Sequence, residues 1–264
     1  MGIIRGSRND ISSFGRKKIY CEGLLNSVDV VFYTTILGIN KNKFEFKPIG
    51  SSNTLLCFAE TNLIENGFCL IDRDFRTIEE SKRLEDKYNI KFLKVHEVEH
   101  FLLNKKYLTQ LDYIRSSVNI EEKISEIIKN KRVRFLADFL QFKINNHLDK
   151  FPRISKLSNS ELPSEDNLID LLFSKLDSNY NEVKIKIKEI REVYINGWKE
   201  EFDNLTIENL PSKEIFKELK NKIFLNPPKE SDIAKDIALL MLKDNYIPED
   251  LRDILVPNEI HNKV

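Results

Sequence analysis

The sequence predicts an α/β protein in which a parallel sheet is flanked by helices and followed by a helical C-terminal extension. Three observations predict this. Segments of strand and helix character alternate up to about residue 105, the pattern of a parallel sheet with helices on its faces. The apolar run 68–71, bounded by Gly67, is typical of a strand buried on both faces. Beyond residue 105 the apolar residues follow helical spacing without a clear strand.

The expected elements of the first part follow in chain order. Residues 1–16 are polar and are expected to form an N-terminal arm. Strands are expected at 17–23, 44–50, 68–71 and 90–94. Helices are expected between them at 27–38, 52–65 and 78–88, the first capped by Ser27 and ended by Gly38. Residues 17–110 are therefore expected to form one domain.

The remainder, residues 111–264, is expected to be a mainly helical insertion or C-terminal region. Helices are predicted at 118–148, 165–176, 183–202, 233–242 and 247–255. Residues 184–188 also alternate as a strand would, but the length of the surrounding segment favours a helix. Phe135, Phe139 and Phe142 follow helical spacing and are expected to belong to the core.

Composition limits the classes of protein to consider. Lys and Arg together number 42, as do Asp and Glu, so the net charge is zero and a nucleic acid would have to be bound by local basic patches. No apolar run approaches the roughly 18 residues of a membrane span, and the N-terminus has no signal-peptide core. The three cysteines lack CxxC spacing and are expected to be buried free thiols. These features together predict a cytoplasmic protein.

Acidic residues follow three of the predicted strands. Glu22 ends the first strand, Asp72 and Asp74 follow the third, and Glu97 and Glu99 follow the fourth. In open α/β sheets, ligands bind at the carboxyl ends of the strands. Carboxylates that point toward one place repel one another unless a cation lies between them, and Mg²⁺ or Mn²⁺ prefers such oxygen ligands. Taken alone, the Asp-Arg-Asp sequence could equally be a solvated turn that caps the next helix.

The order of these motifs resembles that of a TOPRIM domain. The chain carries Cys21-Glu22-Gly23 with 29–33 after it, Ile71-Asp72-Arg73-Asp74-Phe75, and the segment 97–103, which are similar to the family's "EG…D…FY", "DRDF" and "EIENYLL". More narrowly, the chain resembles the TOPRIM-like nucleases encoded beside ABC-type ATPases in anti-phage defence, namely the OLD nucleases and the nuclease effector of the PARIS system. The resemblance covers about residues 16–110 and departs from the family at His100, which often is Asn, and at the turn 50–53, which is less basic.

The resemblance implies a TOPRIM-like (Rossmann-like) fold and metal-dependent cleavage of phosphodiester bonds. Glu22 would be a general acid/base or a metal ligand, Asp72 and Asp74 would hold Mg²⁺ or Mn²⁺, and Glu97 and Glu99 would complete the metal shell. Some relatives use a late lysine, for which Lys222 is a candidate beside Lys217 and Lys220.

The resemblance also implies partners and a substrate. Such effectors are held by an ABC-type ATPase and released, often as dimers, when a phage product is sensed. Some then cleave host tRNA, so the expected substrate is RNA and the expected role is abortive infection.

Basic side chains could bind the nucleic acid. The candidates are Arg73 and Arg76 beside the acidic pair, and Lys129, Lys131, Arg132 and Arg134 in a basic run. The first two could instead balance the carboxylates, and the run could be a solvated helix face. Asp29 is expected to form a salt bridge or a helix cap.

Other functions remain open from the sequence. A TOPRIM-like module could bind an ATPase or nucleic acid without cutting, and an OLD-like nuclease could cleave DNA. His96 and His100 lie four residues apart, as in zinc proteases, but Glu97 and Glu99 suit the acidic set better. A topoisomerase or primase role would need a domain with an active-site tyrosine or a nucleotide site, and neither is visible.

Overall fold

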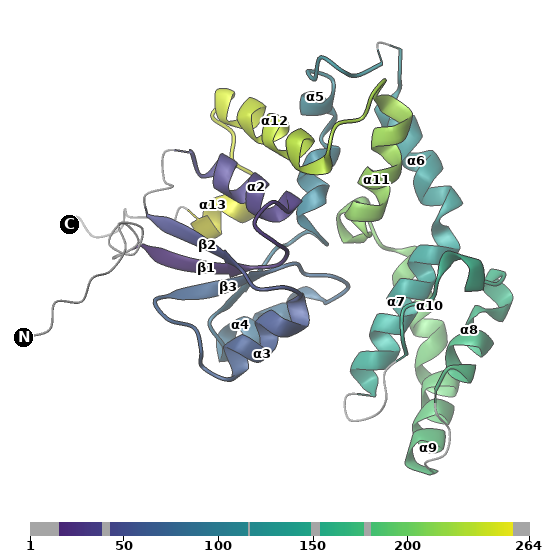
Figure 1. The fold of residues 1–264 in the computed structure, drawn as a ribbon. Coiled ribbons are helices and arrows are strands. Elements are labelled where there is room, and N and C mark those ends of the chain that lie inside the picture. The colour runs from purple at the N-terminus through teal and green to yellow at the C-terminus, as the bar shows by residue number, and fades with distance from the viewer. Residues whose placement is uncertain (1–15, 39–42, 116, 149–153, 177–180, 256–264) are drawn as a thin grey trace, which may run out of the picture. The chain divides into compact units, whose positions relative to one another are not determined.

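The chain forms two compact units. The computed structural model describes residues 16–38, 43–115, 117–148, 154–176 and 181–255, without the side chains of 181–183 (Figure 1). The expected arm 1–16 therefore lies outside the described residues except for Arg16. One unit comprises residues up to 118 together with residues from 212 onward, and the other comprises 119–211. The structure thus divides the chain differently from the expected boundary at residue 110, because the last helices belong to the unit that contains the sheet.

The first unit contains the four-stranded parallel sheet that the sequence predicts. Its strands are β1 (Lys17–Cys21), β2 (Phe44–Pro48), β3 (Gly67–Ile71) and β4 (Ile90–Phe92), in the order β2-β1-β3-β4. Ile19 of β1 pairs with Phe46 on one side and with Phe68 on the other. Because β1 and β3 are neighbours in the centre of the sheet, the residues that follow them leave the sheet side by side.

Helices cover both faces of this sheet. Those of the unit are α2 (Val28–Ile36), α3 (Ser52–Glu60), α4 (Ile78–Lys87), the 3-10 helix η2 (Val98–Leu103), α5 (Lys105–Leu108), α11 (Ser212–Ile223), α12 (Glu230–Lys243) and α13 (Glu249–Leu255). Helix α2 lies on one face and packs against α12, while α3 and α4 lie on the other face (Figure 1). Among the described residues, no helix has both the length and the apolar character needed to cross a membrane.

Several helix ends in the first unit follow local sequence rules. Thr77 and Glu80 form a reciprocal capping box at the start of α4, and the Ser51 side chain caps α3. Ser27 stands at the N-cap of α2, as predicted, but its side chain makes no capping hydrogen bond. Gly38 follows the end of α2 with a positive φ of 38°, as expected of a glycine that ends a helix.

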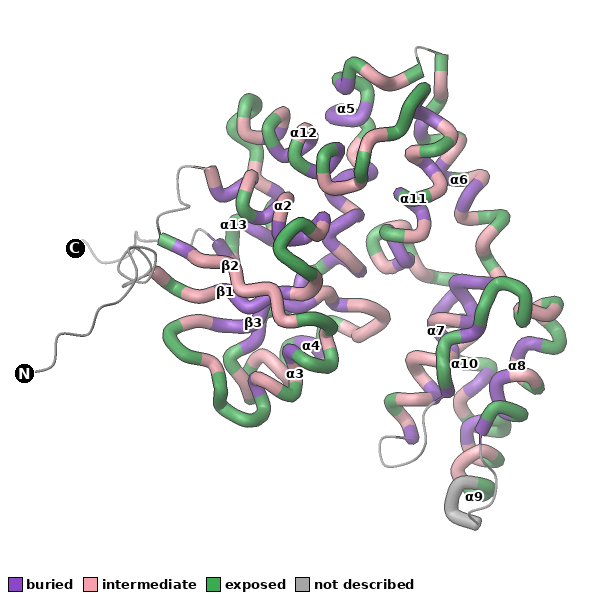
Figure 2. Tube along the Cα trace, viewed as in Figure 1, coloured by how far each residue is buried: buried purple, intermediate pink, exposed green. Residues whose placement is uncertain are grey.

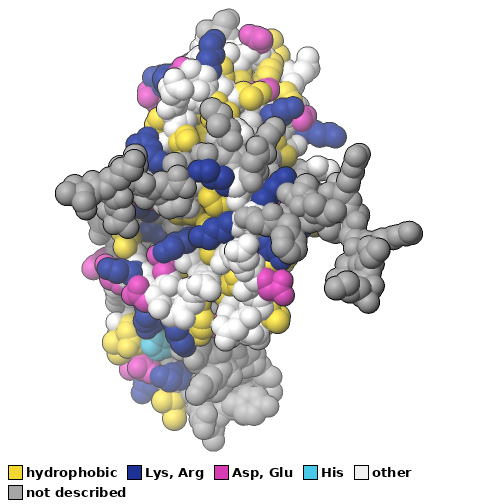
Figure 3. Space-filling model, turned by 90° about the vertical axis from the view of Figure 1, so that its left-hand side faces the viewer, with side chains coloured by type: hydrophobic (Ala, Val, Ile, Leu, Met, Phe, Trp, Pro, Cys, Tyr) yellow, Lys and Arg dark blue, Asp and Glu magenta, His cyan; other side chains and the backbone are white. Residues whose placement is uncertain are grey.

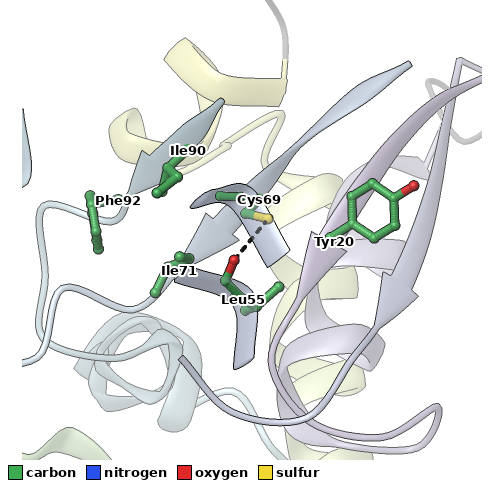
Figure 4. Close-up of a cluster of buried hydrophobic side chains, with 7 residues drawn as sticks. Tyr20, Leu55, Cys69, Ile71, Ile90 and Phe92 are labelled. Carbon is green, nitrogen blue, oxygen red and sulfur yellow. Dashed lines mark hydrogen bonds between the residues drawn. The ribbon is translucent and has the colours of Figure 1, made fainter. Parts of the chain in front are cut away.

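The core of the sheet lies under α3 and α4. One buried cluster comprises Tyr20, Leu55, Ala59, Cys69, Ile71, Ile90 and Phe92 (Figure 4). The central strands β1 and β3 are mostly buried, as the apolar runs predict, whereas β2 is mostly half-buried (Figure 2). The prediction for the cysteines is wrong at one position: Cys21 and Cys69 are buried and free, but Cys57 is exposed because it lies on the outer side of α3.

The second unit is helical. Its elements are α6 (Ile120–Asn130), α7 (Arg132–His147), η3 (Asn159–Glu161), α8 (Glu165–Ser174), α9 (Asn181–Glu189), the π-helical turn η4 (Ile190–Tyr194), α10 (Ile195–Asp203) and η5 (Ile207–Asn209). The helical interpretation of 184–188 is thereby confirmed. Phe135 and Phe139 of α7 are buried, as expected of core residues, whereas Phe142 is only half-buried.

Gly67 offers a test of how closely β1 and β3 approach. A Cβ atom on Gly67 would lie 1.9 Å from the carbonyl oxygen of Lys18, which is backbone and cannot move alone. We expect Gly67→Ala to lower the free energy of unfolding by about 1–3 kcal/mol, measured by urea denaturation. The control is Gly197→Ala in α10, where a Cβ would meet nothing within 4 Å. That change should be neutral or stabilise by up to about 1 kcal/mol. Equal effects of the two substitutions would contradict the packing described here.

Candidate functional site

The carboxyl ends of the strands open into one cavity of about 650 Å³. Acidic side chains from four parts of the first unit line it: Glu22 after β1, Asp29 on α2, Asp72 and Asp74 after β3, and Glu97 and Glu99 after β4. The structure therefore brings together all five acids that the sequence singled out as metal ligands. It also places Asp29 there: this residue, expected to form a salt bridge or a helix cap, lies in the first turn of α2 and is 8% exposed in the wall of the cavity.

The turn after β3 places Asp72 and Asp74 in one cavity and Arg73 in another. The Asp74 N–H donates to the carbonyl of His96 at 3.1 Å, and Asp74 has a left-handed φ of 52°. This region of φ is uncommon for residues other than glycine but is tolerated by Asp. As a result both aspartates line the cavity, whereas Arg73 is buried and lines a second cavity beside α4 and β4.

Gly23 fixes the direction of the chain after Glu22. Its φ is +89°, and its N–H donates to the carbonyl of Gly50 at 2.8 Å. A Cβ at this position would lie 2.3 Å from the Ser27 hydroxyl oxygen, so only glycine fits the turn. The Oε1 atom of Glu22 is buried and has no hydrogen-bond partner among the described residues.

Glu99 is held in place from two sides. Its 3-10 helix η2 packs against α11, and Phe101 stacks on Phe32 of α2 with ring centroids 5.7 Å apart. Glu99 itself is 2% exposed, and its Oε1 atom also lacks a hydrogen-bond partner among the described residues. Two buried carboxylate oxygens, from Glu22 and Glu99, are thus unsatisfied in the wall of one cavity.

Burial and mutual repulsion raise the pKa values of these acids. The pKa of Glu22 rises to about 7 because the group is desolvated and lies near the charges of Asp74 and Asp29, although backbone hydrogen bonds from Asp72 and Ser52 oppose the rise. For Glu99, desolvation and the charges of Asp29 and Glu97 raise the pKa to about 8. The pKa values of Asp29, Asp72 and Asp74 are also raised, in each case chiefly by desolvation. The cavity therefore holds more carboxylate than it can ionise at neutral pH without a counter-ion.

Lys213 is a residue of the site that the sequence analysis missed. Its backbone N–H donates to Glu97 Oε2 at 2.8 Å, and its Nζ lies 4.0 Å from Glu99 Oε1. The nearby acids, Glu99 above all, raise the pKa of Lys213, so its charge is secure. The helical spacing of Ile215, Phe216, Leu219 and Ile223 could have revealed α11, whereas nothing in the sequence shows that it packs beside η2.

The other late lysines divide according to their position on α11. Lys220, one of the alternatives considered, lines the cavity seven residues after Lys213. Lys222 does not line it, and neither does Lys217, which is exposed. The favoured candidate, Lys222, is therefore not brought to the acids.

Most of the arginines predicted to bind nucleic acid form ion pairs with acids of the protein instead. Arg76 forms an ion pair with Asp74 at 2.8 Å and lies over the Phe92 ring. Arg132 pairs with Asp203 at 2.5 Å and with Glu165 at 3.5 Å.

The rest of the basic run belongs to the same helical unit as Arg132. Arg134 is buried, pairs with Asp138 at 2.9 Å and donates to the carbonyl of Leu157. Lys129 is exposed and Lys131 is half-buried, and neither lines the acidic cavity. The two arginines therefore connect elements of the helical unit.

The two histidines do not line the acidic cavity. His96 is 3% exposed and packs edge-on against Phe75, with the ring centroids 4.5 Å apart. The backbone between His96 and His100 enters a 3-10 helix rather than an α-helix, so the spacing of four residues does not place them on one α-helical face. The zinc-protease pattern thus has no structural counterpart here.

The donor set suits a hard divalent cation. All its ligand atoms would be carboxylate oxygens, which Mg²⁺ and Mn²⁺ prefer, and two of these oxygens are buried without a hydrogen-bond partner among the described residues. Among the described residues, no three such side chains already converge on one point. Two of the acids instead contact neighbours, Asp74 through Arg76 and Glu97 through the Lys213 N–H. A cation would have to draw these side chains inward.

Comparisons with known proteins identify no relative. No protein-family model, curated protein or solved structure matches the chain.

The raised pKa of Glu99 makes a prediction about stability. Between its ordinary value of 4.5 and about 8, the folded protein retains a proton that the unfolded chain has lost, so this group's contribution to stability falls as pH rises through that range. Gln cannot ionise, so Glu99→Gln should become more stable relative to wild type between pH 5 and pH 8. Urea denaturation in the presence of a chelator measures this.

Addition of Mg²⁺ or Mn²⁺ at pH 8 should stabilise wild type more than Glu99→Gln, because a cation compensates the ionised carboxylate. A difference between the two proteins that stays constant across pH would contradict the electrostatic account.

Proposed function

We propose that this chain is a metal-dependent nuclease with a TOPRIM-like active site in the acidic cavity. The observation that carries the proposal is the meeting of Glu22, Asp72, Asp74 and Glu99 at the ends of three parallel strands, where one buried oxygen of Glu22 and one of Glu99 have no hydrogen-bond partner among the described residues. The order of the acidic motifs along the chain supports the same class. A structural ion-pair network would instead pair its carboxylates with bases, whereas the acids here outnumber the lysines in the cavity wall.

The residues divide the chemistry of phosphodiester hydrolysis between them. Asp72, Asp74 and Glu99 would hold Mg²⁺ or Mn²⁺, with Glu97 and Asp29 at the edge of the set. A bound cation would neutralise the negative charge that develops on the phosphate and would orient the attacking water. Glu22, whose pKa is about 7, can accept a proton from that water near neutral pH. Lys213, fixed beside Glu97 and Glu99, can stabilise negative charge on the reacting phosphate.

The biological role is proposed from the resemblance of the motifs. In that proposal the chain is an effector of anti-phage abortive infection, held by an ABC-type ATPase and active, as a dimer, on RNA such as host tRNA after release. On the face that Figure 3 draws, Lys and Arg side chains are interspersed with acidic and apolar ones, so an anionic partner would have to be bound by local groups, as the zero net charge implies.

Expression in cells tests the nuclease proposal. Brief expression of wild type should generate new, discrete RNA ends, in tRNA above all, when the ends of total RNA are sequenced. Glu22→Gln should abolish them, because it removes the proton acceptor, and should lower the rate of Mg²⁺- or Mn²⁺-dependent RNA cleavage by the purified protein at least about 100-fold. Glu60→Gln, an exposed acid on α3, is the matched control and should behave as wild type.

The outcomes separate the candidate functions. Cleavage of DNA alone would favour the OLD-like alternative. Cleavage that Glu22→Gln leaves intact would contradict the assignment of the site. Intact RNA and DNA with wild type, in the presence of the ATPase partner and its trigger, would favour a non-catalytic interaction module.

A further inference from the structure

The acidic cavity has a basic side that metal binding does not explain. Lys213, Lys220 and Lys229 line it together with Ser231, all from α11 and the start of α12. Lys213 already contacts two of the acids, Glu97 through its backbone N–H and Glu99 through its Nζ. The other two lysines have no role in holding a cation, since like charges repel it.

Lys220 is paired with an acid in the same cavity wall. Its Nζ lies 2.7 Å from Glu230 Oε1, and the two side chains are only 18% and 26% exposed. Both residues line the cavity. The Glu230 carboxylate thus lies where an anionic group of a ligand would contact Lys220.

Lys229, the residue before Glu230, is exposed at the same cavity. No acidic side chain among the described residues forms an ion pair with it. Ser231, two residues on, contributes a hydroxyl that can donate to a phosphate oxygen. This side of the cavity therefore offers three groups to a ligand. They are Lys229, which has no acidic partner among the described residues, Lys220, whose carboxylate partner a ligand could displace, and the Ser231 hydroxyl.

We propose that Lys220, Lys229 and Ser231 form a subsite for a phosphate next to the one that is cleaved, so that the substrate is a polynucleotide and not a mononucleotide or a small phosphate ester. This inference rests on the proposed function, because it takes the acidic side of the cavity as the place of cleavage. Lysine ammonium groups bind phosphates as point charges and do not read bases, so the subsite positions the strand without selecting its sequence. Glu230 acts as an internal competitor that the neighbouring phosphate displaces from Lys220.

Binding of a fluorescent 12-nucleotide single-stranded RNA tests the subsite without cleavage. Anisotropy titrations use the full chain with Ca²⁺ in place of Mg²⁺, over a range of salt concentrations, and the RNA is checked for intactness afterwards. Lys220→Gln and Lys229→Gln should each weaken binding severalfold and reduce the slope of log K against log salt by about 0.7, the value for one single-strand phosphate contact. Glu230→Gln should tighten binding, because it frees Lys220.

Lys217→Gln is the matched control. Lys217 is exposed on the same helix but does not line the cavity, so its loss should leave the affinity and the slope unchanged. Wild-type slopes in Lys220→Gln and Lys229→Gln would overturn the proposal. So would weaker binding by Glu230→Gln, since that would show the pair with Lys220 to be merely structural.

Cleavage of two substrates separates this inference from the proposed function. Bis(p-nitrophenyl) phosphate has a single phosphate and cannot occupy the subsite and the acidic side together, so Lys220→Gln and Lys229→Gln should raise KM for the RNA severalfold more than KM for this ester. Equal losses on both substrates would overturn the subsite. If wild type hydrolysed neither substrate, the proposed function would fail, and the binding titrations would still decide whether the subsite exists.

Discussion

Carboxylates are crowded together at the carboxyl ends of β1, β3 and β4, and the rest of the site depends on how their negative charge is compensated. Parallel pairing makes these ends meet, so any acids that follow the strands are forced into one place. Five such acids and Asp29 of α2 then line a single cavity, together with Glu230 of α12, and desolvation with mutual repulsion raises the pKa of five of the seven. A fold gains no stability from such a set, which is why the arrangement points to a ligand of opposite charge rather than to a structural role.

One contact from a distant part of the chain and one local contact compensate part of this charge. Helix α11 brings Lys213 to Glu97 and Glu99, and Arg76 draws Asp74 toward itself. These cations satisfy part of the acidic set in the protein as it stands, and they also keep the carboxylates apart. The proposed reaction needs the same side chains to turn toward a cation, so under that proposal the cavity would complete its geometry only on binding.

The sheet and the acids that follow its strands could be predicted because each signal is local. Residues 68–71 are apolar without interruption, and Asp72 and Asp74 follow directly. The rule that ligands bind at strand ends then places Glu22, Glu97 and Glu99 at the same edge. The direction of Arg73 could not be predicted, because the turn after β3 and the left-handed φ of Asp74 depend on the contact with His96.

Lys213 and the basic side of the cavity could not be predicted for a different reason. They lie more than 110 residues after Glu99, beyond the helical unit formed by 119–211, and only tertiary packing of α11 against η2 brings them back. The basic run 129–134 was predicted either to bind phosphates or to be a solvated helix face. Arg132 instead pairs with Asp203, which tertiary packing brings near, and Arg134 pairs with Asp138 four residues on in the same helix.

The most direct test of the account is anomalous diffraction from crystals of the full chain soaked with Mn²⁺ at pH 8. The central claim is that the acidic cavity binds a divalent cation. It predicts an anomalous peak at coordinating distance from the carboxylate of Asp72 and from at least one of Glu22, Asp74 and Glu99. Manganese bound elsewhere, with the cavity free of any peak, would contradict it.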